Sequence, residues 1–452
     1  MYLNELIQID KNIARSVNLE RDASNIDQIR RFQLTQMARK VLDRFIGALE
    51  GNSERAWSLT GPFGTGKSSF CNFLFALCSG PKSLMRKAAF ENFEQTDPLL
   101  FQRFANARKE MGKKGLFHLR AVSRYESLNE TLLRSLEEAF EKNKTVEAAD
   151  IRRRIVTLKK ESFVKTADVM DLLEKSTKIT RKKLLIVVDE FGKNLEFMAH
   201  NPSKGDIFIL QSLAECNFSY LWVCLHQAFG DYASGLSQIQ RNEWQKIQGR
   251  FDDISYLEPP THVVNLILKA MRKNPEFGNK IEERLDKWAE VQADLMKNIK
   301  IRGISDLDRK TIKQLYPFSP LSAVVLGELS YRFAQNDRTI FSFLSSETHQ
   351  ALSGYLSKYS IDSESPVPFL GLDWLYDYFC EITSQIHGDR STTQRWIEIQ
   401  SLIGGFENNG ALELKLLKTI GVLNLLSNVP GIKASLEIIK TAMGAGFNEK
   451  EK

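Results

Sequence analysis

The sequence predicts an α/β fold, in which a parallel sheet lies between two layers of helices and is followed by helical regions. Two observations predict it. Five short apolar runs alternate with helical patterns, at residues 56–60, 115–122, 184–188, 220–225 and 254–257. Such alternation is typical of a parallel, three-layer α/β domain. Beyond Pro260 the apolar residues recur at helical spacing and no convincing strand follows.

The first element of this domain is a strand, a glycine-rich loop and a helix. Residues 61–68 fit the phosphate-binding pattern G-x-x-x-x-G-K-[ST], after the apolar run 56–60 and before the apolar helix 69–78. Glycines let backbone N–H groups turn inward, and the helix N-terminus adds partial positive charge, so this P-loop would hold a polyphosphate. We expect ATP to contact the following residues: Gly61, Pro62, Phe63, Gly64, Thr65, Gly66, Lys67, Ser68 and Ser69. Lys67 would reach the β- and γ-phosphates, and the Ser68 hydroxyl would ligate Mg²⁺.

The second strong pattern is a buried strand that ends in two acids. Residues 184–188 form a continuous, β-branched apolar run, as in a strand covered on both faces, and Asp189 and Glu190 follow. The carboxyl end of such a strand lies beside the P-loop. Asp189 is therefore predicted to hold Mg²⁺ through water, and Glu190 to polarise the attacking water for hydrolysis.

Two further candidates follow later strands. His226 and Gln227 come directly after the run 220–225, where either could bond the γ-phosphate or the attacking water as a polar sensor; a histidine at a strand end also occurs for structural reasons alone. Arg250 precedes the final strand. It would either reach the nucleotide of a neighbouring subunit or form a surface ion pair with Asp252 or Asp253.

The remaining patterns divide the chain into an N-terminal helical segment (1–50), the P-loop core (51–260), a helical lid (261–365) and a C-terminal helical unit (366–452). The clearest linker is 363–368. Residues between Arg15 and Arg31 would either cover the adenine or pack against the core. The basic run at 152–154 and 159–160 is either a solvated helix face or an anion-binding surface. Residues 448–452 resemble the start of a further helix, so the chain is expected to continue in a longer protein.

Composition excludes several classes of protein. At 452 residues, with 42% hydrophobic and 26% charged residues, the chain suits a globular protein of two or three domains. No apolar run is long enough to cross a membrane, and the N-terminus does not read as a secretory signal. The five cysteines form no C-x-x-C pair, which favours reduced core residues in the cytoplasm. A net charge of +6 permits nucleic-acid binding without arguing for it.

Five sequence blocks together resemble a known group of proteins. They are residues 61–69, 184–193, 221–229, 243–260 and 316–344, and the resemblance extends from about residue 15 to about residue 440. The group is the ATPase core of large bacterial phage-defence proteins, namely the ATP-binding components of BREX-type exclusion systems and related ATPases between AAA+ and STAND. The blocks at 248–254 and 335–344 are more particular to this group than the P-loop and the acidic strand.

This resemblance implies an AAA+/STAND-like P-loop core, a helical lid and a winged-helix-like C-terminal unit. It places Arg250 where AAA+ relatives carry an arginine finger, and Arg332 and Arg338 near a second sensor. It implies an ATPase that uses ATP and Mg²⁺, oligomerises through its nucleotide site and serves antiphage defence with other subunits, on DNA in some cases. Two alternatives remain open: a DNA loader or initiator in replication or transposition, and a slowly hydrolysing STAND-type scaffold.

Overall fold

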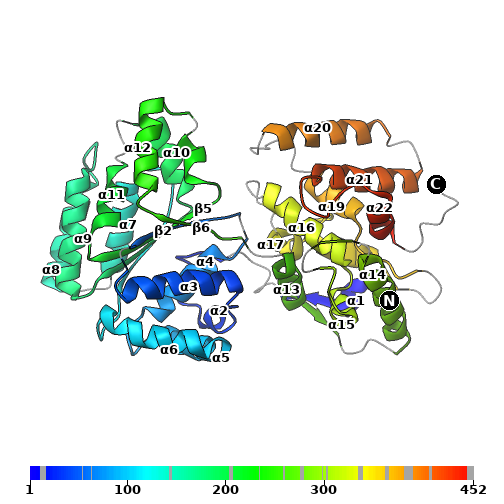
Figure 1. The fold of residues 1–452 in the computed structure, drawn as a ribbon, viewed down its shortest axis with the longest axis horizontal. Coiled ribbons are helices and arrows are strands. Elements are labelled where there is room, and N and C mark those ends of the chain that lie inside the picture. The colour runs from blue at the N-terminus through cyan, green and yellow to red at the C-terminus, as the bar shows by residue number, and fades with distance from the viewer. Residues whose placement is uncertain are drawn as a thin grey trace. The chain divides into compact units, whose positions relative to one another are not determined.

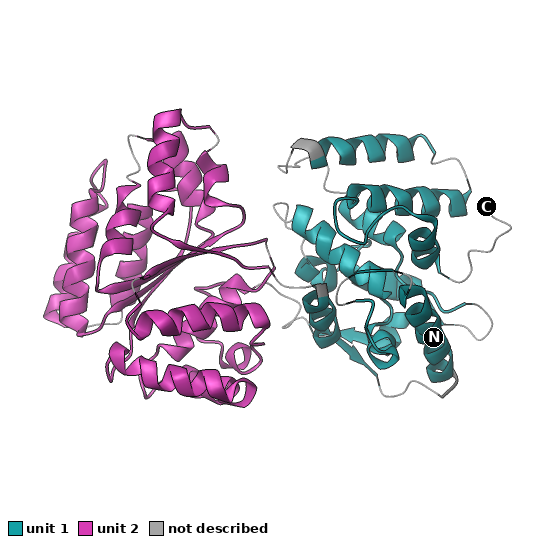
Figure 2. Ribbon diagram, in the orientation of Figure 1, with its two compact units in different colours: residues 1–16, 258–452 teal, residues 17–257 magenta. Residues whose placement is uncertain are grey.

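The structure, a computed structural model, describes residues 1–10, 17–52, 54–62, 64–141, 145–202, 207–233, 235–257, 260–274, 279–297, 299–301, 304–333, 340–361, 366–380, 390–406 and 410–444. It divides into two compact units. Unit 1 comprises residues 1–16 and 258–452, and unit 2 comprises residues 17–257 (Figure 2). The N-terminal segment expected at 1–50 is therefore divided between the two units.

Unit 2 is built on one parallel sheet of five strands. They are β2 (Ala56–Thr60), β3 (Phe117–Val122), β4 (Leu184–Asp189), β5 (Ser219–Leu225) and β6 (Asp252–Ser255). The strand order is β3-β4-β5-β2-β6, so β5 lies between the P-loop strand and the acidic strand. All five predicted strands are present. The last begins and ends two residues earlier than expected, because Asp252 and Asp253 pair with Trp57 and Ser58 of β2.

Helices cover both faces of this sheet (Figure 1). One face carries α2 (Ile26–Arg30), α3 (Gln36–Leu49), α4 (Lys67–Leu77), α5 (Leu84–Thr96) and α6 (Pro98–Ala107). The other carries α7 (Leu128–Glu141), α8 (Val146–Leu158), α9 (Thr166–Thr180), α10 (Gly192–His200), α11 (Phe208–Glu215) and α12 (Gln238–Gln248).

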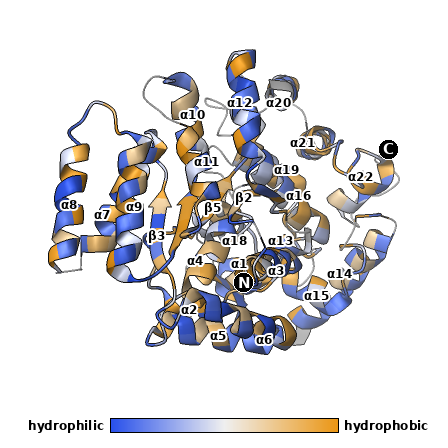
Figure 3. Ribbon diagram, turned by 60° about the vertical axis from the view of Figure 1, so that its left-hand side comes forward, coloured by the Kyte–Doolittle hydropathy of each residue, from blue (hydrophilic) through white to orange (hydrophobic). Residues whose placement is uncertain are grey.

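The central strands show why the chain folds in this way. Every residue of β4 and β5 is buried, and successive side chains enter different cores: Leu185 and Val187 one, Ile186 and Val188 the other. Figure 3 shows β5 as a hydrophobic ribbon among amphipathic helices. Parallel strands covered on both faces require this continuous apolar pattern. The predicted fold class, a three-layer α/β core with a parallel sheet followed by helices, is confirmed.

Unit 1 is mainly helical. Its helices are α1 (Leu3–Leu6), α13 (Pro260–Ala270), α14 (Asn279–Lys297), α15 (Arg309–Leu315), α16 (Pro320–Phe333), α17 (Ile340–Ser345), α18 (Leu352–Lys358), α19 (Leu372–Cys380), α20 (Arg390–Gly404), α21 (Ala411–Leu425) and α22 (Leu436–Met443). One core cluster extends from Leu3 through the region expected as the lid to Ala442. Residues on both sides of the predicted linker belong to this core cluster. The backbone N–H of Leu370, after the linker, also donates to the carbonyl of Pro317, before it, at 2.9 Å.

Two expectations for this unit need correction. The N-terminus is not wholly helical, because β1 (Ile7–Ile9) is a strand; the region after Pro260 does contain a strand, β7 (Met271–Lys273). These two pair antiparallel, with Ile7 opposite Lys273. Three residues are too few for a visible period-2 pattern, so each strand forms because of its distant partner. None of the helices in the described ranges is both long and apolar enough to cross a membrane.

Candidate nucleotide-binding site

The glycine-rich loop joins β2 to α4 in the geometry that its sequence predicts. Gly64 and Gly66 have φ of +80° and +90°, which is the left-handed region that favours glycine. Gly66 caps α4 without contributing a side chain, so the first N–H groups of the helix face the loop. Such a terminus attracts anions. Phe63, the third residue of the motif, lies outside the described residues.

Close packing explains the first glycine of the motif. A Cβ on Gly61 would lie less than 3.0 Å from the carbonyl oxygen of Tyr256, which follows β6. The N–H of Gly61 donates to the carbonyl of Leu225 at the end of β5, at 3.1 Å. The loop thus starts between the ends of two strands. Thr65 closes its turn by donating from Oγ1 to the Pro62 carbonyl at 3.0 Å.

Lys67 is the cation of the loop. Only 6% of the residue is exposed, and its Nζ donates to the Pro62 carbonyl at 2.7 Å and to the Gly61 carbonyl. Burial lowers the pKa of this ammonium, and the nearby Asp189 carboxylate opposes that shift. Since a buried charge is unfavourable unless it is paired, the loop carbonyls and Asp189 keep the ammonium in place. Ser69 lies half-buried in the first turn of α4.

The loop and the acidic strand meet through one short hydrogen bond. Ser68 Oγ donates to Asp189 Oδ2 at 2.6 Å, and Asp189 is only 6% exposed. Burial raises the pKa of the Asp189 carboxyl, while the Ser68 hydrogen bond and the Lys67 charge lower it. The two predicted Mg²⁺ ligands are therefore brought together. Among the described residues, no cluster of three or more His, Cys, Asp or Glu side chains could hold a metal ion by itself.

Glu190 has an unusual backbone. Its φ is +54°, a region that residues other than glycine seldom adopt, and its N–H donates to Asp189 Oδ1 at 2.9 Å. Its carboxylate forms an ion pair with Lys193, in the first turn of α10. Sequence reasoning placed Glu190 beside Asp189 but missed Lys193. The only local indication was the spacing of three residues, which places charged side chains on one face of a helical turn.

His226 lies at the same edge of the sheet. It directly follows β5, whose last carbonyl accepts from Gly61. Its side chain is half-buried, whereas Gln227 is exposed. Burial lowers the pKa of His226 to about 3, and the positive charges of Lys67 and Lys193 lower it further. The imidazole is therefore neutral at physiological pH, and both lysines lie close enough to act on it.

Arg250 lies elsewhere in unit 2. It follows α12 and precedes β6, whereas the P-loop follows the carboxyl end of the parallel strand β2. The P-loop and Arg250 of one chain are therefore at opposite ends of these strands. The alternative interpretation, a surface ion pair with Asp252 or Asp253, is wrong about the partner. Arg250 pairs with Glu215 at 3.1 Å, while Asp252 pairs with Arg44 and Asp253 accepts from Ser58 Oγ at 2.6 Å.

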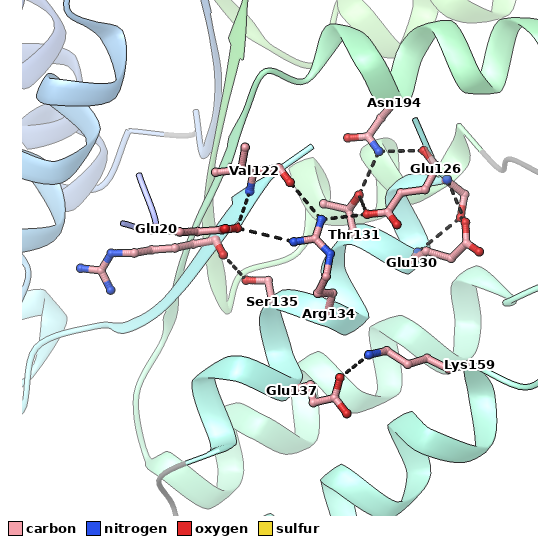
Figure 4. A network of polar contacts seen from close by, with 12 residues as sticks. Glu20, Val122, Glu126, Glu130, Thr131, Arg134, Ser135, Glu137, Lys159 and Asn194 are labelled. Carbon is pink, nitrogen blue, oxygen red and sulfur yellow. Dashed lines mark hydrogen bonds and ion pairs between the residues drawn. The ribbon is translucent and has the colours of Figure 1, made fainter. Parts of the chain in front are cut away.

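A network of hydrogen bonds and ion pairs that includes Asn194 of α10 was not predicted from the sequence (Figure 4). Arg134, on α7, donates to the carbonyl of Val122 at 2.9 Å and to Glu126 at 2.8 Å, and pairs with Glu20 at 3.5 Å. Glu20 also accepts from the N–H of Val122 at 3.0 Å. Asn194, on α10, donates to the Glu126 carbonyl at 2.8 Å. The network ties the segment before α2 to the end of β3 and to the helix that follows Glu190.

The other sequence candidates have structural partners or lie outside the described residues. Arg332 donates to the carbonyl of Leu425, at the end of α21, at 2.7 Å and also contacts Asn428, while Arg338 lies outside the described ranges. Arg15 and residues 448–452 also lie outside them. In the basic run, the following donors contact oxygen acceptors: Arg152, Arg153, Arg154 and Lys159. Such contacts favour a solvated helix face.

Comparisons with known proteins complete the description. No protein-family profile matches the chain, and no curated protein matches it. Among solved structures, the ORC2 protein of Aeropyrum pernix, in ADPNP-ADP complexes, is similar at 11% identity and a TM-score of 0.34, covering 90% of this chain and 85% of that one. Cdc6p of Pyrobaculum aerophilum is similar at 10% identity and a TM-score of 0.32, covering 97% of this chain and 89% of that one.

Proposed function

We propose that the protein is a Mg²⁺-dependent ATPase. The observation that carries the proposal is the hydrogen bond from Ser68 to Asp189, which joins the P-loop to the acidic strand. The loop N–H groups and the start of α4 would bind the phosphates, and the Lys67 ammonium would neutralise part of their charge. Glu190 follows Asp189 at the same edge, where a carboxylate can accept the proton of an attacking water.

The residues present fit Mg²⁺. This ion takes near-octahedral oxygen ligands and is usually held by one or two protein oxygens together with phosphates and water. Ser68 Oγ would be a direct ligand, and Asp189 Oδ2, which accepts a hydrogen bond from it, would hold the ion through water. When bound, the ion would neutralise charge that develops on the phosphates. His226 stays uncharged, so it can exchange hydrogen bonds with a phosphate oxygen or a water without adding charge.

Calorimetry and phosphate release test this proposal. The wild-type protein with Mg²⁺ should bind ATP and release phosphate. Lys67→Ala should weaken ATP binding by roughly ten-fold to a hundred-fold, since hydrogen bonds to charged groups contribute about 1.5–3 kcal/mol. Lys175→Ala is the matched control, because Lys175 pairs with Asp171 on the exposed side of α9. Unchanged ATP affinity in a folded Lys67→Ala protein would contradict the proposal.

For the cellular role, we propose a cytoplasmic ATPase that forms homo-oligomers through its nucleotide site. The resemblance of the five sequence blocks favours a motor or switch in bacterial antiphage defence. A DNA loader or initiator is the second candidate, because an AAA+-like core followed by a helical unit would equally serve it. A STAND-type scaffold is the third.

Turnover assays separate these roles. Steady hydrolysis that duplex DNA stimulates favours an enzyme working on DNA, in defence or in replication. Slow hydrolysis, with assembly triggered by a protein or phage ligand, favours the scaffold. Neighbouring methyltransferase, nuclease or phosphatase-like genes would favour defence over replication.

A further inference from the structure

We propose that Lys193 is a second phosphate-binding residue of this site, which pairs with Glu190 in the nucleotide-free protein and turns to the terminal phosphate when ATP binds. In this scheme Glu190 is released for its part in hydrolysis only when a terminal phosphate is present. The inference rests on the proposed ATPase function and adds to it a residue that distinguishes ATP from ADP.

A chain of contacts leads from the P-loop to Lys193. Ser68 Oγ lies 2.6 Å from Asp189 Oδ2, and Asp189 Oδ1 accepts from the N–H of Glu190 at 2.9 Å. The Glu190 carboxylate in turn holds the Lys193 ammonium. Lys193 also acts on His226, at the end of the neighbouring strand β5. The ammonium is therefore beside the edge where β4 and β5 end and the P-loop begins.

The backbone that carries Lys193 is fixed on two sides. Before it, Gly192 packs against Tyr232, whose Cζ would lie 2.7 Å from a Cβ at that position. After it, the fully buried Asn194 donates to the Glu126 carbonyl at 2.8 Å and to Thr131 Oγ1 at 2.9 Å (Figure 4). The first turn of α10 is thus anchored. The Lys193 side chain, which is 52% exposed, is what remains able to change partner.

Electrostatics supplies the reason for a change of partner. Asp189 and Glu190 are adjacent carboxylates, and the neutral His226 does not offset their charge. A terminal phosphate bound at this edge adds further negative charge. An ammonium paired with one carboxylate gains by moving toward a terminal phosphate, because that phosphate carries up to two negative charges and a carboxylate carries only one. ADP lacks this phosphate, so it would leave the Glu190–Lys193 pair intact.

The competing interpretation is an ordinary ion pair within one helical turn. Exposed pairs of this kind contribute about 0–1 kcal/mol and have no reason to depend on nucleotide. The positive φ of Glu190 favours the exchange of partners, since strained backbone of this kind is common at ligand-binding and switch regions. The two interpretations differ in what they predict for nucleotide affinity.

Calorimetric titration with ADP and with a non-hydrolysable ATP analogue, both with Mg²⁺, tests the inference. Lys193→Ala should weaken binding of the analogue by about ten-fold to a hundred-fold and leave ADP affinity within about two-fold. Lys193→Arg should restore most of the affinity for the analogue, because a guanidinium also binds phosphate. Lys175→Ala, which removes another lysine of an exposed ion pair, should change neither.

A double-mutant cycle tests the exchange of partners. Glu190→Gln should tighten binding of the analogue by about three-fold to ten-fold, because Lys193 no longer has to leave a carboxylate. The gain should vanish in the Lys193→Ala background. A gain that persists there would reflect relief of repulsion alone and would overturn the exchange.

The outcomes separate the two proposals. If the wild-type protein binds neither nucleotide, the ATPase proposal and this inference both fail. If it binds both and Lys193→Ala changes neither affinity, Lys193 contacts no terminal phosphate and only this inference fails. If Lys193→Ala weakens both nucleotides equally, Lys193 does not distinguish them and the inference is again overturned.

Discussion

Ser68 and Asp189 are 121 residues apart in the chain and share a hydrogen bond of 2.6 Å. Ser68 lies in the first turn of the helix after the first core strand, and Asp189 ends a strand two positions away in the sheet. A buried carboxylate with a raised pKa is unfavourable for folding by itself, so its presence at this point favours a functional reason.

Asp189→Asn tests the role of Asp189 in metal binding apart from its effect on stability. The amide oxygen can still accept from Ser68, and burying a neutral group is less costly than burying a charge, but the amide NH2 cannot accept from the N–H of Glu190 and the Lys67 ammonium loses a nearby charge. Because these effects oppose each other, the free energy of unfolding should change by no more than about 1–3 kcal/mol. The Mg²⁺ site loses its negative ligand, and Mg²⁺-dependent phosphate release should fall by at least about a hundred-fold. Urea unfolding measures the free energy of unfolding, and a phosphate-release assay measures the turnover. Undiminished turnover would remove Asp189 from the metal site.

Glu190→Gln separates binding from chemistry. The amide cannot accept the proton of a water, while Asp189 still serves the metal, so ATP and Mg²⁺ should bind at least as tightly as in the wild type. Turnover should fall by about 10²- to 10⁴-fold. A single-turnover assay measures it. A rate equal to that of the wild type would mean that Glu190 is not the catalytic acceptor, and would favour the STAND-type scaffold.

Gly61→Ala tests the close approach of two strand ends. An added Cβ would come closer than 3.0 Å to the Tyr256 carbonyl oxygen, a backbone atom that cannot turn away. We expect a loss of about 1–3 kcal/mol in the free energy of unfolding, the usual range for overpacking. Gly230→Ala is the control, because a Cβ there meets nothing within 4 Å. Urea unfolding followed by circular dichroism compares them, and equal stability of the two variants would count against the tight contact.

The parts of the site that sequence predicts are local in the chain. Residues 61–68 have fixed residue types at fixed spacing, and β4 is apolar from Leu184 to Val188, so the loop, the strand and their meeting at one edge all follow from local pattern and from the geometry of parallel sheets. The same holds for the position of His226 directly after β5.

The parts that sequence does not predict depend on distant partners. Arg250 pairs with Glu215 instead of a neighbour in the chain, because α11 brings its last residue to that end of the sheet. Glu20 and Asn194 join one network only after the segment before α2 has packed beside β3. Strands β1 and β7 are three residues each and form only by pairing with each other. Tertiary packing decides such contacts, and no local period reveals them.

His226 gives a prediction for pH. Its pKa is about 3 in the folded protein and about 6.5 in an unfolded chain. Between these values the unfolded chain binds a proton that the folded protein does not, so stability falls as the pH is lowered through this window. His226→Gln cannot take up that proton. The loss of stability between about pH 7 and about pH 5 should therefore be smaller in this variant, as measured by urea midpoints. An equal loss would contradict a His226 that stays neutral in the folded protein.

Arg250 gives a prediction for assembly. It is 51% exposed, and its pair with Glu215 is half-exposed as well, so releasing it costs only about 0–1 kcal/mol. Since Arg250 and its own P-loop lie at opposite ends of the strands, it can reach a γ-phosphate only in a neighbouring subunit. Arg250→Ala should therefore bind ATP normally and lose hydrolysis by roughly 10³- to 10⁵-fold, the range for an arginine that acts in trans.

Mixing experiments decide whether Arg250 acts between subunits. Neither Lys67→Ala nor Arg250→Ala protein should hydrolyse ATP alone. In a mixture, Arg250 of a Lys67→Ala subunit can face the intact P-loop of an Arg250→Ala subunit, so part of the turnover should return at such interfaces. Mass measurement confirms that mixed oligomers form, and Glu215→Gln is the control that releases Arg250 without removing it. Absence of recovery at every mixing ratio, with mixed oligomers present, would show that Arg250 does not complete a neighbour's site.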